Sequence, residues 1–225
     1  MIELSAEWKA AYPGAVAGFL VMRGARNSSQ NAALDELREG IESDLRGRFA
    51  EAGKEALRAH PVIAAYESYY RKYRKTYHVA LQLDSVIWKD RSITASSMLV
   101  QVMFMAELSN MLLTAAHDLG RISPPVRVLV ATGRESYATL GGETRATKEG
   151  DMMMSDAVGV ISSVLLGPDQ RTAISPSTTD VLYTVYAPAG IGQDRVRSHL
   201  QCIQRFVTAA SPRAVTESLE WLPAD

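Results

Sequence analysis

The stretch VGVISSVLLGPDQRTAISPSTTDVLYTVYAP, residues 158–188, decides how the rest of the chain is interpreted. Its two ends are rich in Val, Ile, Leu and Tyr, which favour a pleated, buried surface, so both ends are predicted strands. Between them, residues 167–179 hold several hydroxyls, an amide and one guanidinium. On the local pattern alone, this segment is an ordinary turn between two strands. The alternative is a pocket wall, because loops held on a rigid scaffold often bind ligands.

The chain around this stretch has its helical patterns first and most of its strand patterns later. A strand is predicted over 15–22, helices over 32–52, 62–77, 79–88, 95–116 and 193–209, and β runs over 126–131, 136–140, 151–155, 158–166 and 181–186. Segregated helices and strands favour an α+β fold, with helices packed on antiparallel or mixed sheet layers. No linker or repeat divides the sequence, so a single domain over residues 1–225 is expected.

The composition is typical of a globular protein, with 47% hydrophobic residues, 22% charged residues and a formal net charge of −1. That charge gives no long-range attraction to RNA or to an anionic membrane, so nucleic-acid binding would need a local basic patch. The single cysteine, Cys202, excludes an internal disulfide and is expected to be buried in a helix, in a reducing compartment. No signal peptide and no run long enough to span a membrane is present, so we expect a cytoplasmic protein without a membrane partner.

One segment interleaves aromatic and basic residues. Between Val62 and Tyr77, tyrosines recur at spacings of three and four, and four cations follow or separate them: Arg71, Lys72, Arg74 and Lys75. Basic and aromatic side chains together are typical of single-stranded nucleic-acid binding, so these four cations are candidate RNA contacts. The alternative is that the tyrosines pack in the core while the cations form a solvated face.

Sequence motifs for metal, phosphate or nucleophilic chemistry are absent. The chain has no glycine-rich phosphate loop, no H-E-x-x-H and no G-x-S-x-G. The four histidines lie far apart in sequence without metal-ligand spacing, so each is expected to be structural or exposed. No metal and no cofactor is predicted.

A second group of polar residues interrupts the apolar segment that begins at residue 98. Glu107 and Asn110 are three residues apart, so on a helix they share a face. His117 and Asp118 follow where helix is expected to give way to loop, and an aspartate there can cap backbone N–H groups. Buried polar groups need partners. These side chains therefore either fix the helix end internally or form the wall of a pocket.

Taken in order, these pieces resemble a known family. HPVIAAY, AELSN, HDLGRI, VRVLVATGRESYATLGG, GDMMMSD and the opening stretch follow one another as in the B3/4 domain, in a free-standing form. This domain is the editing module of the phenylalanyl-tRNA synthetase β subunit. The similarity covers about residues 60–210, with residues 1–59 before it as an N-terminal strand and helix extension. It implies an α+β fold and, in the synthetase, hydrolysis of tyrosine wrongly attached to the phenylalanine tRNA.

The resemblance also implies which positions belong to the pocket. The positions that match family motifs include Glu107, Asn110, Asp118, Glu135, Asp156 and Thr178. Two positions depart from the family pattern. The histidine that usually precedes the Asp-Leu pair falls near Ala115, with His117 in a different register, and the glutamate that contacts the tyrosine hydroxyl falls near Thr184.

The first functional hypothesis is a hydrolase that acts in trans on a misacylated tRNA. An aminoacyl ester is already activated, so its site needs an oriented water and donors for the developing oxyanion more than a strong nucleophile. Asn110 or His117 would orient the water, and Arg171 or Thr172 would donate to the oxyanion. The aminoacyl group would contact a further set of residues: Glu107, Asp118, Gly167, Thr178 and Thr184.

The second hypothesis is a module without catalysis, which binds RNA, a free amino acid or a related small molecule. A third is a partner-binding protein in which the pocket is vestigial. The sequence predicts neither the cognate amino acid and tRNA nor the oligomeric state.

Overall fold

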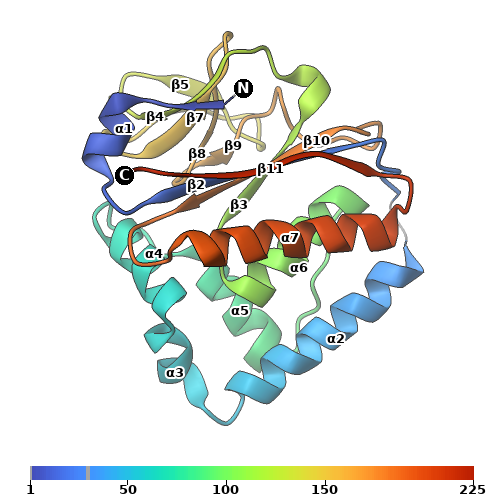
Figure 1. Cartoon of the computed structure of the whole chain (residues 1–225). Helices are drawn as coiled ribbons and strands as arrows, with labels where there is room; N and C mark the ends of the chain where they lie inside the picture. Colours follow the sequence, from blue (N-terminus) through green and yellow to red (C-terminus); the bar gives the residue numbers. More distant parts are fainter. Residues whose placement is uncertain (1, 29–30) are drawn as a thin grey trace.

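The computed structural model describes residues 2–28 and 31–225 and arranges them in three layers (Figure 1). The middle layer is a four-stranded sheet in the order β11-β2-β10-β3. Its strands are β2 (Val16–Arg23), β3 (Thr114–Asp118), β10 (Val181–Ala187) and β11 (Val215–Pro223). The helices cover one face of this sheet, and a second sheet lies over the other face.

The second sheet has five strands in the order β1-β4-β7-β8-β9. These are β1 (Ile2–Leu4), β4 (Val126–Val130), β7 (Met152–Ser155), β8 (Val160–Ser163) and β9 (Gly167–Pro168), beside a hairpin of β5 (Ser136–Ala138) and β6 (Thr144–Ala146). β1 pairs parallel with β4, and the other neighbours pair antiparallel. The expected α+β fold with mixed sheet layers is therefore confirmed.

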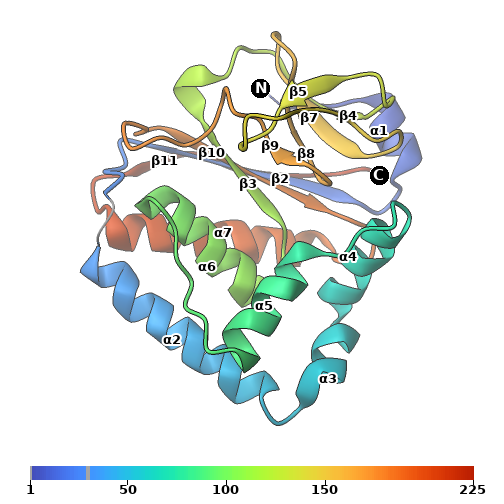
Figure 2. The ribbon, with the colours of Figure 1, turned by 180° about the vertical axis from the view of Figure 1, so that it is seen from behind.

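The helical layer lies below the middle sheet, with α5 and α6 prominent from behind (Figure 2). The helices of the chain are α2 (Ala32–Phe49), α3 (Gly53–Ala59), α4 (Pro61–Arg71), α5 (His78–Trp88), α6 (Met98–Asn110) and α7 (Gln193–Ala210), with short α1 (Ala6–Ala11) near β4 and a 3-10 turn at Leu119–Arg121. α7 packs directly on β2: a Cβ added at Gly18 would lie 2.5 Å from Val196 Cγ1. Only glycine allows this close approach.

β10 is the centre of the fold, and all seven of its residues are buried. A strand covered on both faces reads as a continuous apolar run, which explains the pattern VLYTVYA in the sequence. β10 pairs antiparallel with β2 on one side and with β3 on the other. Because β2 comes from the first 59 residues, the N-terminal part of the chain completes the middle sheet.

The helix predicted over 95–116 is too long. α6 ends at Asn110, Met111 adopts the left-handed conformation with φ 62°, and β3 begins at Thr114. Residues 111–117 are all buried. Periodicity cannot separate helix from strand in a run that is apolar on most sides, so no pattern marks the end of the helix.

Several other segments differ from the prediction. The helix expected over 62–77 ends at Arg71, and the chain turns at Arg74, where φ is 55°. The N-terminal elements β1 and α1, and the strand β6, were not predicted. β11 was also missed: its residues are mostly half-buried or exposed at the edge of the sheet, so it has no apolar run to mark it.

Candidate functional site

A cavity of about 290 Å³ lies between α6, the start of β3 and the β8–β9 turn of the second sheet. Small-molecule sites commonly measure about 300–1,000 Å³, so this one suits a ligand the size of an amino acid. Its wall is largely apolar and includes Val100, Met103, Phe104, Leu113, Val164 and Ile174. Leu140, between the two strands of the β5–β6 hairpin, is 57% exposed and lies at the opening.

Glu107 carries the carboxyl group on the cavity wall and is only 1% exposed. Its Oε1 accepts a hydrogen bond of 2.7 Å from the Thr114 backbone N–H. Within residues 2–28 and 31–225, no hydrogen bond or ion pair reaches the other oxygen, Oε2. Burial raises the pKa of Glu107 to about 8, so the carboxyl group holds a proton at neutral pH. A buried, half-satisfied carboxyl group in a cavity is a candidate ligand contact.

The surroundings of Glu107 hold its position. Thr114 Oγ1 lies 2.7 Å from Nε2 of His199 on α7, and the two share a hydrogen bond. Burial lowers the pKa of His199 to about 3, so this imidazole is neutral. The Tyr66 hydroxyl accepts from the Leu113 N–H and donates to the Tyr186 carbonyl. These bonds fix the turn from α6 to β3 and therefore the place of Glu107.

His78, the first residue of α5, lies at the opening of the cavity. Its Nδ1 is 3.4 Å from the Tyr70 hydroxyl, a weak contact that orients the ring. The ring is accessible from outside, yet the side chains around it enclose it enough to lower its pKa, so it is neutral at pH 7. A neutral imidazole beside a cavity can accept a proton from water. The sequence prediction had grouped His78 with structural or exposed histidines.

Three residues with hydroxyl side chains line the cavity from the sheets: Thr114 on β3, Ser163 on β8 and Tyr186 on β10. The Tyr186 hydroxyl is 2.6 Å from Ser162 Oγ, and the Tyr137 hydroxyl is 3.3 Å from Ser163 Oγ. Thr184 is fully buried and does not line the cavity, although its hydroxyl lies close enough to Tyr186 to lower the pKa of that phenol slightly against the effect of burial.

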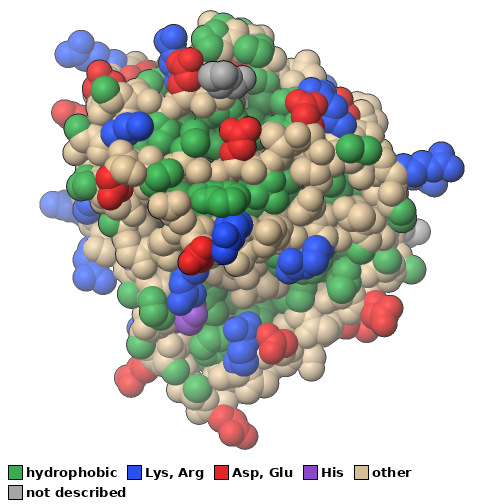
Figure 3. Space-filling model, viewed as in Figure 1, with side chains coloured by type: hydrophobic (Ala, Val, Ile, Leu, Met, Phe, Trp, Pro, Cys, Tyr) green, Lys and Arg blue, Asp and Glu red, His purple; other side chains and the backbone are tan. Residues whose placement is uncertain are grey.

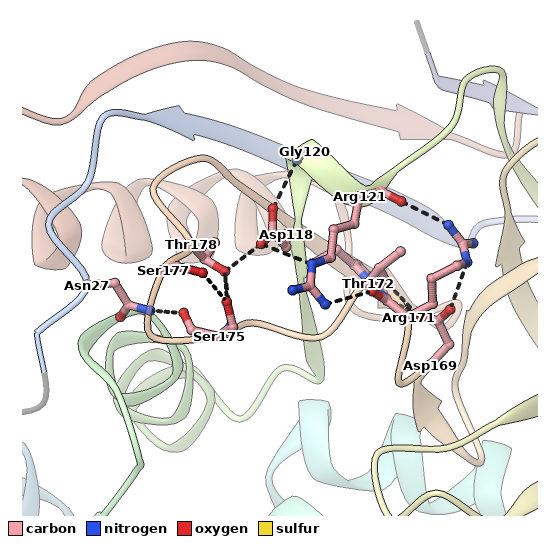
Figure 4. A network of polar contacts seen from close by, with 11 residues as sticks. Asn27, Asp118, Gly120, Arg121, Asp169, Arg171, Thr172, Ser175, Ser177 and Thr178 are labelled. Atoms are coloured by element: carbon pink, nitrogen blue, oxygen red, sulfur yellow. Dashed lines mark hydrogen bonds and ion pairs between the residues drawn. The ribbon is translucent and has the colours of Figure 1, made fainter.

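Most of the polar residues predicted for the site belong instead to a network of polar contacts, part of which Figure 4 shows around Asp118, Arg171 and Thr178. We call it the loop network; its residues are His117, Asp118, Asp156, Asp169, Arg171, Thr172 and Thr178. Asp156 accepts two hydrogen bonds from Arg171, of 2.9 and 3.0 Å, and also accepts from three backbone N–H groups. Arg171 donates in addition to the Arg121 carbonyl at 2.9 Å. Its guanidinium is thus already occupied.

His117 and Thr172 form the centre of the loop network. The Thr172 hydroxyl donates to Asp169 Oδ1 and therefore accepts from His117 Nδ1–H, 2.8 Å away. Burial lowers the pKa of His117 to about 3, and the nearby Arg171 charge adds to this effect. His117 Nε2 is buried without a hydrogen-bond partner in the described chain. Neither His117 nor Thr172 lines the cavity.

Asp118 and Thr178 close the other end of the loop network. Asp118 Oδ2 accepts from the Thr178 hydroxyl at 2.7 Å, and Oδ1 accepts from the Gly120 N–H at 3.0 Å. Asn27 then joins the same loop to β2 through a 2.7 Å bond to the Ser175 carbonyl (Figure 4). Of the residues predicted for catalysis or substrate binding, only Glu107 and Gly167 line the cavity.

Asn110 faces a different opening from Glu107. Its side-chain amide donates to the Ala106 carbonyl at 3.1 Å, one turn back along α6. Together with Arg48, His60 and Arg195, it lines a second opening beside the start of α7. The expected shared pocket wall is therefore not what the structure shows, because the helix ends at Asn110 and the chain turns away.

The basic residues predicted to contact RNA form a turn rather than a helix face. Of the segment Arg71–Lys75, which we call the basic turn, only Arg71 is helical. Lys75 Nζ donates to the Leu165 carbonyl at 3.1 Å, which attaches the basic turn beside the cavity wall. Lys and Arg side chains project from the molecule's edge near the end of α4 (Figure 3). The alternative prediction for the tyrosines is confirmed for Tyr66, Tyr69, Tyr70 and Tyr77, which are buried.

Other predicted properties can be compared with the described residues. Cys202 is a buried free thiol on α7, as expected. Within residues 2–28 and 31–225, no cluster of three potential metal ligands occurs. Over the same residues, no helix has the length and apolar character needed to cross a membrane.

Comparison with known proteins identifies similarities in sequence and fold. A family model described as the B3/4 domain matches residues 68–220. A solved N-terminal fragment of the phenylalanyl-tRNA synthetase β subunit from Pyrococcus horikoshii shares 13% sequence identity, with a TM-score of 0.48. The similarity covers 97% of this chain and 54% of that fragment, so the chain spans about half of its length. No curated protein matches the chain.

Proposed function

The chain belongs to the B3/4 domain family, and on that premise we propose that it hydrolyses the ester bond of aminoacyl-tRNA, with the amino acid held in the cavity. The observation that carries this proposal is the half-satisfied carboxyl group of Glu107 in an apolar cavity of about 290 Å³ that opens beside a neutral histidine. The combination offers a binding site for an amino acid and a proton acceptor near the position of its ester.

In this proposal His78 takes the place that the sequence prediction gave to Asn110 or His117. The neutral imidazole accepts a proton as a water oxygen attacks the ester carbon. The bond from that carbon to the ribose oxygen then breaks, and the ribose oxygen receives the proton. Tyr70 orients the ring at the start of this sequence. An activated ester needs no covalent intermediate for this reaction.

The basic turn supplies the proposed contact with the tRNA backbone. Arg71, Lys72 and Arg74 are exposed, and within the described chain none of them has an acidic partner in an ion pair. Lys75 joins the turn to the strand connection that borders the cavity. Phosphates held there would lie next to a site occupied by the amino acid at the end of the same RNA. The proposed place of action is the cytoplasm, where the tRNA is found.

Hydrolysis is tested with a panel of mischarged tRNAs and purified protein. We expect release of the amino acid from at least one of them, and a loss of about 10²–10⁴-fold in rate for His78→Ala. His117→Asn is the comparison variant, because His117 lies in the loop network and not on the cavity wall. The proposal fails if every ester stays intact, and the role of His78 fails if its replacement leaves the rate unchanged.

RNA binding is tested separately with uncharged tRNA at several salt concentrations. Replacing Arg71, Lys72, Arg74 and Lys75 by Gln should weaken binding and flatten its salt dependence, because fewer counterions are released. A control with the same change in charge replaces four exposed, scattered cations: Lys9, Arg127, Arg205 and Arg213. Equal losses in both variants would show a general effect of charge and would remove the basic turn from the proposal.

A second candidate function is binding of an amino-acid-like molecule without catalysis. The observation that favours it is the loop network, in which Arg171 and Thr172 already donate to acceptors of the protein, so an oxyanion would have to compete with them. Thermal-shift measurements with amino acids and their derivatives distinguish the two functions. A ligand that stabilises the protein, together with no hydrolysis of any mischarged tRNA, supports this second candidate.

A further inference from the structure

We propose that the cavity selects amino acids whose carboxyl group is esterified or amidated and rejects the free amino acids, because Glu107 pairs with the ligand's ammonium group while no Lys or Arg among the described residues lines the cavity to pair with a carboxylate. The inference rests on the proposed function for its choice of an amino acid as the ligand. It deepens that function, since it gives a physical reason why the site would act on a charged tRNA while free amino acids are abundant.

The charges on the cavity wall carry this inference. In the described chain, the titratable side chains that line the cavity are those of Glu107, His78 and Tyr186, and no Lys or Arg lines it. Two cations of the adjoining segments are engaged elsewhere: Lys75 bonds to the Leu165 carbonyl, and Arg171 to Asp156. The wall can thus supply one negative charge and no permanent positive charge.

The groups packed around Glu107 leave its second oxygen for a ligand. Thr114 N–H holds Oε1, and three tyrosine hydroxyls nearby donate to backbone carbonyls: Tyr66 to Tyr186, Tyr70 to Val164 and Tyr77 to Met111. His199 reaches Glu107 only through Thr114. None of these groups competes for Oε2. An ammonium group placed there would complete the hydrogen bonding of a carboxyl group that the protein leaves half satisfied.

An amino acid ester and a free amino acid differ in the charged groups that they would leave without a partner in the cavity. An ester or amide carries one charge, the ammonium, and pairing with Glu107 gives a complex without an isolated charge. A free amino acid also carries a carboxylate, which would lie beside the neutral His78 and apolar side chains such as Leu140 and would lose part of its water without a cation to pair with. Burying an unpaired charge costs much more than burying a neutral ester group. The free amino acid is therefore the weaker ligand.

The test compares three forms of each ligand by calorimetry at pH 7. Leucine, methionine and phenylalanine are each used as the free amino acid, the amide and the decarboxylated amine. For the side chain that fits, the amide and the amine should bind at least about tenfold more tightly than the free amino acid, as expected for one unpaired charged group. Glu107→Gln keeps the size of the side chain and an acceptor for the Thr114 N–H, and should abolish the preference.

Two controls make the outcome specific. Met103→Leu changes the shape of the same wall without changing its charge, so it should weaken all three forms alike. Binding of the amine, measured in two buffers with different ionisation enthalpies, should release close to one proton from the wild-type protein and none from Glu107→Gln. Before binding, Glu107 is protonated and the amine is an ammonium ion. In the complex an ionised Glu107 pairs with the ammonium, so one proton is released.

The inference is overturned if the free amino acid binds as tightly as the amide, if the preference survives in Glu107→Gln, or if the folded protein binds none of the nine compounds. None of these measurements involves tRNA or turnover. If the ligand preference is absent, hydrolysis of mischarged tRNA can still be observed. If hydrolysis is absent, the ligand preference can still be observed, so the two results are distinguishable.

Discussion

The loop network and the cavity are built partly from the same segment of chain, residues 163–178. They differ in how fully their carboxyl groups are hydrogen-bonded. In the loop network, Asp156 accepts five hydrogen bonds and Asp118 accepts two. In the cavity, Glu107 has one donor for two oxygens. Hydrogen-bond donors are thus plentiful for the carboxylates of the loop network and scarce for the carboxyl group on the cavity wall.

This difference separates residues that stabilise the fold from residues that are free to bind. A side chain whose donors and acceptors are all occupied has to give up hydrogen bonds before it can contact a ligand. Arg171 comes close to this case, because it already donates three hydrogen bonds to Asp156 and the Arg121 carbonyl, although its charge and its loop made it a candidate for catalysis. Glu107 can gain a hydrogen bond without losing one. The comparison predicts that changes in the loop network act on stability and changes at Glu107 act on binding.

The largest expected effect is that of Asp156→Ala. The substitution leaves the Arg171 guanidinium and the N–H groups of Ser123, Val158 and Gly159 without their acceptor. Removing one partner of a fully buried ion pair destabilises a protein by about 3–5 kcal/mol, and because the Arg171 side chain is 33% exposed the loss here should lie at the lower end of that range. Urea unfolding of the variant measures this loss in the free energy of unfolding. Asp156→Asn is the control, since it keeps one acceptor oxygen and should lose less. A loss below about 1 kcal/mol for Ala would contradict a stabilising role for the network.

A smaller effect is expected for Glu107→Gln, and it depends on pH. The pKa of Glu107 is about 8 in the folded protein, above its value near 4.3 in the unfolded chain. Between these values the folded state binds more protons, so stability falls as pH rises. From pH 6.5 to 8, ionisation of Glu107 should lower the free energy of unfolding of the wild-type protein by about 1–2 kcal/mol. The Gln variant should not show that decrease.

The difference between the two proteins is the quantity to measure. His117 and His199 have lowered pKa values, so their contribution to stability is lost as pH falls below about 6.5, which is the opposite direction. Both histidines are present in both proteins, so their effect cancels in the difference. Parallel stability curves for wild type and Gln from pH 6.5 to 8 would show that Glu107 is ionised in the folded state.

The part of the fold that could be predicted from sequence is the part with a distinctive pattern. β10 is covered on both faces and α7 on one, and each leaves the corresponding signature: a continuous apolar run in Val181–Ala187, and apolar residues at helical spacing in Gln193–Ala210. The α6–β3 boundary leaves none. It depends on the left-handed Met111 and on pairing with β10, a contact between residues about 70 positions apart in the chain.

The candidate site was predicted less well for a related reason. Sequence identifies polar residues but not whether they satisfy one another. His117, Arg171 and Thr172 look like catalytic residues until their hydrogen bonds are known. Glu107 was found because an acid inside an apolar helix is unusual. His78 was missed because one histidine at the start of a helix has no pattern; only the fold brings it to the opening of the cavity.

The smallest expected effect, that of Thr178→Val, bears most directly on the boundary between the two regions. Valine has nearly the shape of threonine, so the change removes hydrogen bonds without opening a cavity. Asp118 Oδ2 loses a donor at 2.7 Å and the Ser175 N–H loses an acceptor at 2.9 Å. A loss of about 1 kcal/mol in the free energy of unfolding is expected.

Thr178 does not line the cavity, so the affinity for an amino acid amide should change less than twofold. A variant with unchanged stability and a much weaker ligand would instead restore Thr178 as a substrate contact, as the family resemblance implied. It would also mean that the loop network and the cavity work as one site.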